Sequence, residues 1–470
     1  MDATTIQKHR RTVWQSVVEA IKGTHQDFTE GSISRAVFLL ATPMVLEMFM
    51  ESLFAIVDVF WVTRLGSMAV ATVGLTESML TLVFSVAFGV SMSTTAMVAR
   101  RIGEKNTPGA VTAATQSILL GITIALLMGL PGFWFSSVLL GLMGAPAELI
   151  ASGHRYTAVV FSGSISIMLL FLNNAIFRGA GDAAVAMRVL WVANLINLVL
   201  DPCFIFGLGP FPALGVTGAA VSTLIGRTSG VIYQFWILTH GRSRISIRAK
   251  DIRIVPDVIL ALMRVSSTGV LQFAVGHTSW IVLVRIISAF GSAAVAGYTI
   301  GIRIFIFAVL PSWGLSGAAA TMVGQNLGAG KPHRAERAVY LTAFYNVLVL
   351  GAVAFVFIAF PRQIVAAFTS DATVAPLAVS CLRILACGNL AYAVGMVMVQ
   401  AFNGAGDTVT PTIINIIGFW FCEIPLAWVL AFPAHMQVRG VFISIPCAEA
   451  LITFMGVSMF LRGRWKKRVI

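Results

Sequence analysis

Three carboxylic acids lie within one long apolar stretch near the start of the chain. Glu47, Glu51 and Asp58 are four and seven residues apart. At about 100° per residue, a helix places them within roughly 40° of one another, on a stripe about 16 Å long. The stretch from 36 to 66 could span a bilayer, whose hydrocarbon core needs about 20 apolar residues. An acid inside it costs about 2.5–3.5 kcal/mol on insertion scales, so these carboxyl groups are expected to be paired or functional.

A second polar group falls on the apolar stretch 183–207, where Asn194, Asn197 and Asp201 share one helical face. With Asp58 they could enclose a polar pocket, lined further by Asn173 or Asn174 and by Thr223. Two carboxyl groups beside amides suit a proton site, because burial favours the protonated form. The same oxygen-rich set, Asp58, Asn197 and Asp201, could also hold Na⁺, and no other metal is expected. The structural alternative is that Asp201 caps a helix end beside Pro202 while Asp58 pairs with Arg227.

The remaining acids and the aromatic residues of the second half are open to two interpretations. Glu47 and Glu51 lie nearer the cytoplasmic end, where Glu47 is expected to reach water. Glu77, Glu423 and Glu449 are expected to form structural ion pairs with Arg285, Arg303 or Arg383. A substrate cavity in the second half could be lined by a set of polar and aromatic residues, for each of which core packing is the alternative: Gln272, Phe273, His277, Trp280, Trp313, Tyr392 and Met396.

The composition requires lipid around these stretches. The chain has 470 residues, of which 58% are hydrophobic and 11% charged, and its mean hydropathy is +0.89. A soluble protein of this length could not bury so much apolar side chain. A net charge of +13 would suggest nucleic acid as the partner of a soluble protein. Here the basic residues cluster between apolar segments, which indicates membrane orientation instead and excludes a nucleic-acid partner.

Twelve apolar segments follow a polar N-terminal segment, residues 1–35, whose residues 13–21 are expected to form a short surface helix. The segments are 36–63, 70–99, 110–137, 150–177, 183–207, 214–239, 258–288, 294–323, 336–360, 374–401, 409–432 and 438–461. Because basic residues concentrate before the first segment, in every second loop and in the tail 462–470, both termini are expected in the cytoplasm, with the protein in the inner (plasma) membrane. The basic stretch 241–257 then links an N-lobe (36–240) to a C-lobe (258–461).

The chain matches itself when shifted by 225 residues. Gly66 and Gly103 meet Gly291 and Gly328, and the run F-R-G-A-G-D (177–182) meets F-N-G-A-G-D (402–407). Each half has six segments, so the halves share one orientation and should be related by an axis along the membrane normal. Asp182 and Asp407, which follow the glycine turns, are expected to be helix N-caps. Among the polar candidates, Asp58 and Asp201 have only Leu283 and Leu426 as counterparts, so the ionisable cluster belongs to the first half.

At this point the residues resemble a known family. The run D-F-T-E-G-S-I (27–33), Pro43, Asp58 followed by Leu65-Gly66, F-R-G-A-G-D and N-L-V-L-D-P-C-F-I-F-G (197–207) are similar to MATE multidrug exporters. The resemblance covers residues 27 to about 460. It implies a V-shaped, all-α membrane protein with twelve transmembrane helices in two six-helix lobes related by pseudo-twofold symmetry. It also implies export of cationic or amphipathic compounds in exchange for H⁺ or Na⁺.

The resemblance also assigns site residues. The DinF-like branch of the family keeps its coupling cluster in the N-lobe, which by motif position implies Asp58, Asn197 and Asp201, together with Asn174 and Thr223. Glu51 lies where that branch commonly has a neutral polar residue. The acids of the NorM-like pattern would fall near Gly276 or His277 and near Tyr392, and this chain lacks both, which favours the DinF-like interpretation.

The sequence therefore predicts a secondary antiporter that works by alternating access. The chain contains no Walker A, H-E-x-x-H or G-x-S-x-G motif, so we expect neither an ATP-driven pump nor an enzyme, and no cofactor. The expected partners are small molecules and the bilayer, with the monomer as the working unit. One alternative is a lipid-linked oligosaccharide flippase of the same superfamily, for which Arg285, Arg303 and Arg383 would line the cavity. A channel or membrane-embedded enzyme is the other alternative.

Overall fold

The computed structural model describes residues 13–23, 26–241, 243–468 and 470, and over these residues its regular secondary structure is helical. The helices of the first half are α1 (Val13–Lys22), α2 (Ile33–Thr63), α3 (Ser67–Gly103), α4 (Thr107–Trp134), α5 (Ser136–Leu142), α6 (Ala147–Ser162), α7 (Ser164–Ala180), α8 (Ala183–Phe206) and α9 (Val216–Thr239). Those of the second half are η2 (Ala249–Asp251), α10 (Pro256–Ser288), α11 (Ser292–Gly328), α12 (Pro332–Ala359), α13 (Pro361–Ala366), α14 (Val374–Gly404), α15 (Val409–Asn415), η3 (Ile416–Glu423), α16 (Ile424–Ala431), α17 (Val438–Leu461) and η4 (Arg464–Lys467).

The twelve expected segments correspond to these helices, with two of them subdivided. The fourth segment consists of α6 and α7, which meet at Gly163, and the eleventh consists of α15, the π-helix η3 and α16. Ten helical stretches in the described part of the chain are long and apolar enough to cross a membrane. The other two of the twelve are α2, with 31 residues, which carries Glu47, Glu51 and Asp58, and α9, with 24 residues, which carries Arg227. Their length suffices to span a bilayer, where the mean requirement is about 20 residues.

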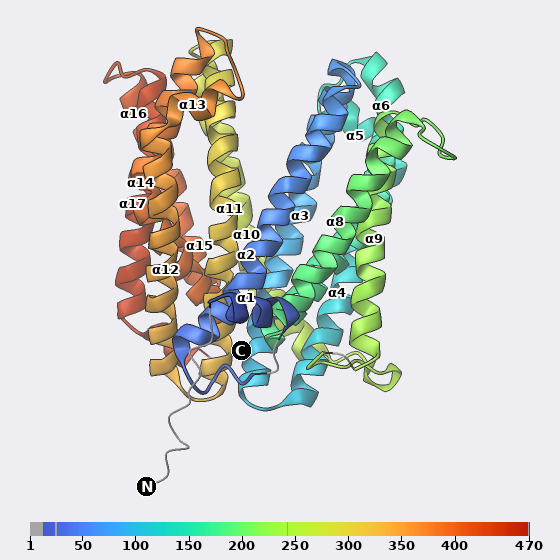
Figure 1. Cartoon of the computed structure of the whole chain (residues 1–470), viewed down its shortest axis with the longest axis vertical. Helices are drawn as coiled ribbons and strands as arrows, with labels where there is room; N and C mark the ends of the chain where they lie inside the picture. Colours follow the sequence, from blue (N-terminus) through green and yellow to red (C-terminus); the bar gives the residue numbers. More distant parts are fainter. Residues whose placement is uncertain (1–12, 24–25, 242, 469) are drawn as a thin grey trace.

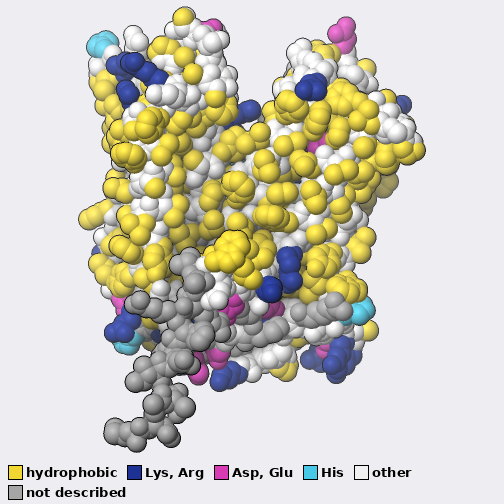
Figure 2. All heavy atoms as spheres, viewed as in Figure 1, with side chains coloured by type: hydrophobic (Ala, Val, Ile, Leu, Met, Phe, Trp, Pro, Cys, Tyr) yellow, Lys and Arg dark blue, Asp and Glu magenta, His cyan; other side chains and the backbone are white. Residues whose placement is uncertain are grey.

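The helices form two bundles that diverge toward one end of the molecule. Figure 1 shows α2–α9, which we call the N-lobe, on one side and α10–α17, the C-lobe, on the other, with α1 and the C-terminus at the end where the bundles meet. The same separation appears as a deep notch in the space-filling view (Figure 2), where hydrophobic side chains cover the flanks and Lys and Arg gather toward the two ends. The all-α, two-lobed fold predicted from the sequence is confirmed.

Glycine contacts show that the internal repeat is structural. A Cβ atom added to Gly103 would lie 1.9 Å from the carbonyl oxygen of Gln325, and one added to Gly328 would lie 2.1 Å from that of Arg100. These two contacts are related by the same shift of 225 residues in both partners. Only glycine allows helix backbones to approach this closely. The repeated glycines therefore join α3 to α11 in two symmetric contacts at the end where the bundles meet, which we call the closed end.

One helix of each lobe, α2 and α10, packs against a helix of the other lobe. In α11, Gly314 lies against Met44 of α2, and the symmetry-related Gly89 of α3 lies against Gly269 and Val270 of α10. The Ser93 and Ser266 hydroxyls, 2.7 Å apart, hydrogen-bond beside the second contact. The N-terminal half of α2 is accordingly packed on α11 and α12 of the C-lobe, while its C-terminal end packs within the N-lobe.

The N-terminal segment ties both lobes together at the closed end. Arg334 of α12 donates to the backbone oxygens of Phe28, Glu30 and Gly31 at 3.2, 2.7 and 2.8 Å. On the N-lobe side, the Arg244 guanidinium donates to the carbonyl oxygen of Gln26. We call residues 26–31 the N-terminal strap, because it is held by a C-lobe arginine and by an arginine of the stretch that follows α9.

Asp182 has a different partner from the one that the sequence predicted. It occupies the N-cap position of α8, but its side chain forms no capping hydrogen bond. Its carboxylate instead accepts hydrogen bonds from the Ser243 hydroxyl (2.5 Å) and the Arg244 backbone nitrogen (2.9 Å), which fixes the linker on the N-lobe. Asp407 does accept from the Thr410 hydroxyl and nitrogen at 2.6 and 3.4 Å, as a capping residue would.

Candidate functional site

The Asp201 side chain is the centre of a buried polar cluster between α8 and α9. It is 1% exposed and accepts a hydrogen bond from the Ser222 hydroxyl. The Asn197 amide bridges it to Thr223: in the orientation that satisfies both neighbours, its nitrogen donates to Asp201 Oδ2 at 3.0 Å and its oxygen accepts from the Thr223 hydroxyl at 3.0 Å. The structure thus brings together Asn197, Asp201 and Thr223, as expected. Ser222 was missed, although it directly precedes Thr223.

Asp58 lies near this cluster without being bonded into it. Its side chain is half-buried and has no hydrogen bond or ion pair with any residue that the structure describes. The Asp58 carboxylate is near enough to Asp201 for the two negative charges to repel, and near enough to Arg227 for an attraction. The Arg227 guanidinium is nevertheless not within 4.0 Å of Asp58, so the two form no ion pair. The direct Asp58–Arg227 pair considered as a structural alternative is therefore absent between these described residues. Asp58 is left as a free carboxyl group facing an arginine.

Glu47 contradicts the expectation that it reaches water. Its side chain is fully buried and forms an ion pair with Arg178 of α7. Asn174 also donates to Glu47 Oε1, at 3.2 Å, and receives a hydrogen bond from Gln234 of α9 at 2.8 Å. Asn174, expected in the Asp201 cluster, thus belongs to a separate Glu47 cluster. The sequence analysis did not single out Arg178, although the internal repeat could have indicated it, because the corresponding residue of the second half is the uncharged Asn403.

Glu51 lies between the two clusters and joins neither by a hydrogen bond. Its Oε2 accepts from the Asn194 amide at 3.2 Å. Charge interactions connect it with Glu47 on one side and Arg227 on the other. The N-lobe therefore holds a line of carboxyl groups along α2 that face α7, α8 and α9, with the Glu47 cluster nearer the closed end.

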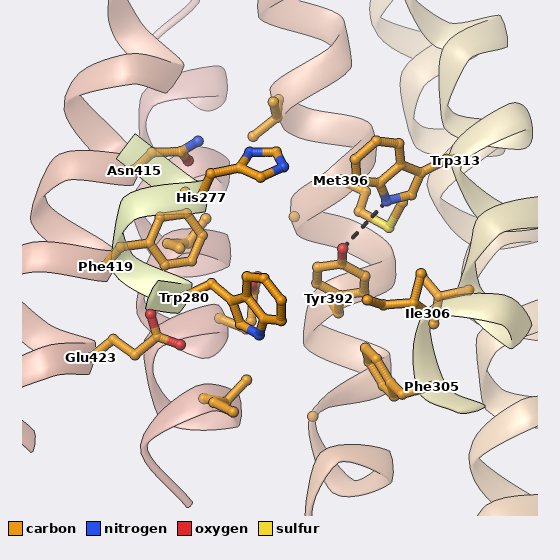
Figure 3. Close-up of a pocket in the computed structure, with 18 of the residues that line it drawn as sticks. His277, Trp280, Phe305, Ile306, Trp313, Tyr392, Met396, Asn415, Phe419 and Glu423 are labelled. Atoms are coloured by element: carbon orange, nitrogen blue, oxygen red, sulfur yellow. Dashed lines mark hydrogen bonds between the residues drawn. The ribbon is translucent and has the colours of Figure 1, made fainter. Parts of the chain in front are cut away.

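A cavity of about 610 Å³ lies in the C-lobe and faces α3 of the N-lobe. The structure places on its wall all the second-half candidates named above: Gln272, Phe273, His277, Trp280, Trp313, Tyr392 and Met396. Figure 3 shows His277 and Trp280 opposite Tyr392 and Met396, and a hydrogen bond from Trp313 Nε1 to the Tyr392 hydroxyl closes one side at 3.3 Å. This cavity has the size and aromatic lining of a small-molecule site.

The N-lobe also contributes to the wall of this cavity. Phe88 of α3 stacks on Phe273 with ring centroids 4.6 Å apart and planes 10° apart, and Met92 lies one turn further along. The sequence did not indicate either residue, because nothing in it shows which face of α3 meets α10. The cavity is thus completed at the interface between the lobes.

The C-lobe acids are not in the ion pairs that the sequence predicted. Glu423 and Glu449 both line the cavity, and neither has an arginine, lysine or histidine within 4.0 Å among the described residues. Arg285, Arg303 and Arg383 are exposed and are not part of the cavity wall. Glu77 is likewise without a direct ion pair in the described structure, although Arg303 and Arg227 both attract it. The pairing predicted for these three acids is therefore wrong.

Comparisons with known proteins agree with this geometry. The MatE family model matches residues 43–203 and 270–429, one range in each lobe. "Probable multidrug resistance protein NorM" of Thermotoga maritima is 27% identical over 440 residues, which cover 93% of this chain and 94% of that protein. "FAD transporter" of Shewanella oneidensis is 25% identical over 430 residues, covering 91% and 94%.

A solved structure described as the "outward-facing conformation of a multidrug resistance MATE family transporter" shares the fold. It superposes with a TM-score of 0.88 at 26% identity, over 94% of this chain and 98% of that one. Family model, relatives and fold all agree with the two-lobed membrane architecture. The chain belongs to the MatE family and is a multi-pass membrane transporter, not an enzyme.

Proposed function

We propose that the protein is an antiporter that exports cationic or amphipathic compounds in exchange for H⁺, with Na⁺ as the alternative coupling ion. The main observation in support is that the buried polar cluster and the aromatic cavity lie in different lobes. The N-lobe holds the carboxyl groups of Asp58 and Asp201 beside amides and hydroxyls, whereas the C-lobe holds an aromatic cavity large enough for a small molecule. The relatives named as multidrug resistance or multidrug export proteins support the same class of substrate.

Asp58, Asn197 and Asp201 are the proposed coupling residues, with Thr223 holding Asn197 and Glu51 contributing charge. Asp58 is free to bind a proton or Na⁺, because no described group neutralises it directly. An ion drives transport only if it binds the outward-facing and inward-facing states with different affinity. The helices α8 and α9 that hold Asp201 belong to the N-lobe alone, while α2 also contacts the C-lobe. Ion binding at Asp58 can therefore act on the contact between the lobes.

The cavity favours export of cations over transport of anions. Among the described residues that line it, two are glutamates and none is lysine or arginine. FAD, transported by one relative according to its name, carries two phosphates, which this wall would repel. The same argument applies to a flippase of lipid-linked oligosaccharides, whose diphosphate would require cationic side chains. The three arginines on which that alternative depended are absent from the cavity wall.

The orientation follows from the positive-inside rule. Lys and Arg occur at both ends, but the basic clusters of the sequence, in 100–105, 244–253, 331–337 and 462–468, belong to segments at the end where the lobes meet. We therefore assign this end to the cytoplasm, together with both termini. The lobes then diverge toward the outside, and the cavity would release substrate in that direction. The likeness to a structure described as outward-facing supports this assignment. The proposed location is the inner (plasma) membrane, with the monomer as the transporting unit.

Transport in proteoliposomes tests the proposal. With an imposed pH gradient, ethidium should move against its own gradient, and each added pulse of ethidium should release protons from the acidic side. Asp58→Asn and Asp201→Asn should abolish the proton movement while the variants still insert and elute as monodisperse protein. A parallel experiment with a sodium gradient and no pH gradient distinguishes the two ions. Retained proton-coupled exchange in both variants would refute the assignment of these two residues.

A further inference from the structure

Two acids of the C-lobe cavity are placed as a pair, on two different helices. Glu423 ends the π-helix η3, and Glu449 lies in the middle of α17. Both line the cavity, and they are near enough for their charges to repel. Their counterparts in the first half are Leu198 and Leu224, so the repeat did not supply them. They are not among the N-lobe groups proposed for ion coupling.

Both acids keep acceptor capacity that the protein does not use. Glu423 is 4% exposed, and its Oε2 accepts one hydrogen bond, from the Ser279 hydroxyl at 2.8 Å. Glu449 has no hydrogen bond or ion pair with any residue in the described part of the chain. Glu423 is thus buried and Glu449 half-buried, each without a cationic partner, and removing an unpaired carboxylate from water is unfavourable. A positively charged ligand in the cavity would supply the missing partner.

A third acceptor on the same wall points to a ligand independently of the acids. The Gln272 side chain lines the cavity and is only 5% exposed, and its Oε1 has no hydrogen-bond partner among the described residues. Buried amide oxygens are nearly always hydrogen-bonded in folded proteins. Gln272 precedes Ser279 by seven residues of α10, which corresponds to about 10.5 Å along one helix face. The acceptors therefore extend over two helical turns.

Aromatic faces lie between these acceptors. Trp280 and Phe419 border the cavity near Glu423, with Tyr392 on the opposite side (Figure 3). An aromatic face attracts a cation that lies within about 6 Å of its centroid. We propose that Glu423, Glu449 and Gln272 form a cation-binding subsite that selects flat aromatic cations, with the charge at the acids and the ring system between Trp280 and Tyr392. This inference rests on the proposed function of the cavity as the substrate site.

Equilibrium binding to the purified protein in detergent tests the subsite without any ion gradient. The probes are ethidium, an aromatic monocation, and Nile red, an uncharged aromatic dye, each followed by fluorescence polarisation at pH 8. Glu423→Gln and Glu449→Gln should each raise the Kd for ethidium about tenfold, because one charged partner is lost. The Kd for Nile red should change less than twofold. Asp257→Asn, which removes an exposed acid at the start of α10, the helix that carries Gln272, is the matched control and should leave both values unchanged.

A gain of affinity provides a test that misfolding cannot imitate. Gln272→Glu adds a charge at the third acceptor and should tighten ethidium binding several-fold, whereas Gln272→Leu should weaken it. Equal losses for ethidium and Nile red, or an unchanged ethidium Kd in both glutamate variants, would overturn the subsite. Failure of the proposed function looks different: wild-type protein would then bind ethidium but not exchange it for protons or Na⁺. Coupled ethidium export with an unchanged apparent affinity in both glutamate variants would instead overturn the subsite alone.

Discussion

Replacing Glu47 by glutamine tests whether the buried ion pair with Arg178 holds α2 to α7. Glu47 is fully buried, and its Oε1 receives hydrogen bonds from both Arg178 and Asn174. Glutamine preserves the shape of the side chain but leaves the guanidinium without its counter-ion. Breaking a buried pair by removing one partner costs about 3–5 kcal/mol. The Arg178 side chain is 30% exposed and can recover some hydration, so we expect the lower end of this range, about 3 kcal/mol.

The variant that removes the other partner, Arg178→Gln, should be less stable than Glu47→Gln. Arg178→Gln leaves the carboxylate of Glu47 in a site from which water is excluded, so we expect a cost of about 4–5 kcal/mol. The double variant Glu47→Gln with Arg178→Gln removes both charges and should recover a coupling energy of at least about 2 kcal/mol. The measurement is the free energy of unfolding in detergent, titrated with denaturant, for the wild type and the three variants. A loss below about 0.5 kcal/mol for Glu47→Gln, as for an ordinary surface change, would refute the reasoning, and so would strictly additive losses.

Three further predictions follow from contacts at the closed end. Gly103→Ala should clearly lower the melting temperature, because the new Cβ would lie 1.9 Å from a backbone oxygen of α11. Gly74→Ala, in the same helix, is the control: its Cβ meets no atom within 4 Å, so the change should be tolerated or stabilising. Equal effects of the two variants would contradict the close approach of the helices. Asp182→Ala removes the acceptor of two hydrogen bonds from the linker and should lower the free energy of unfolding by about 1–3 kcal/mol. Limited proteolysis at 241–257 should become faster, and an unchanged cleavage rate would argue that Asp182 does not fix the linker. Arg334→Gln weakens three hydrogen bonds to the N-terminal strap and should favour states in which the lobes separate at the closed end. The measurement is the rate at which a cysteine placed between the lobes at that end is labelled; unchanged labelling would mean that the strap does not hold the closed end.

Most of the fold could be predicted, because its signals are long or repeated. Apolar runs of twenty or more residues define the spans, and one shift of 225 residues aligns glycines whose contacts in the structure are symmetric. What the sequence does not show is the tilt of each helix. It gives no sign that α2 starts against the C-lobe and ends in the N-lobe. That crossing depends on contacts between residues far apart in the chain.

The candidate site was predictable where its residues share one helix, and less so elsewhere. Asn197 and Asp201 are four residues apart, so their common face follows from helix geometry alone. Glu47 and Arg178 lie on different helices, and a partner on another helix can be identified only when the rotation of both is known. The same limit explains the wrong pairing of Glu423 and Glu449. An arginine was available in the sequence for each acid, but those arginines are exposed and do not line the cavity.

The asymmetry between the lobes constrains how coupling could work under the proposed function. The symmetric glycine contacts hold α3 to α11 at the closed end, so in this structure the lobes are joined there and diverge at the other end. The proposed ion site and the C-lobe cavity are separate spaces, since Asp58 and Asp201 do not line the cavity. An effect of the ion on the substrate must then pass through elements that belong to both regions. Two are present: α2, which carries Asp58 and packs through Met44 on Gly314, and α3, whose Phe88 forms part of the cavity wall against Phe273. Because each contact is between closely packed groups with little free space, a change in the tilt of α2 or α3 cannot be absorbed locally and must move the C-lobe wall.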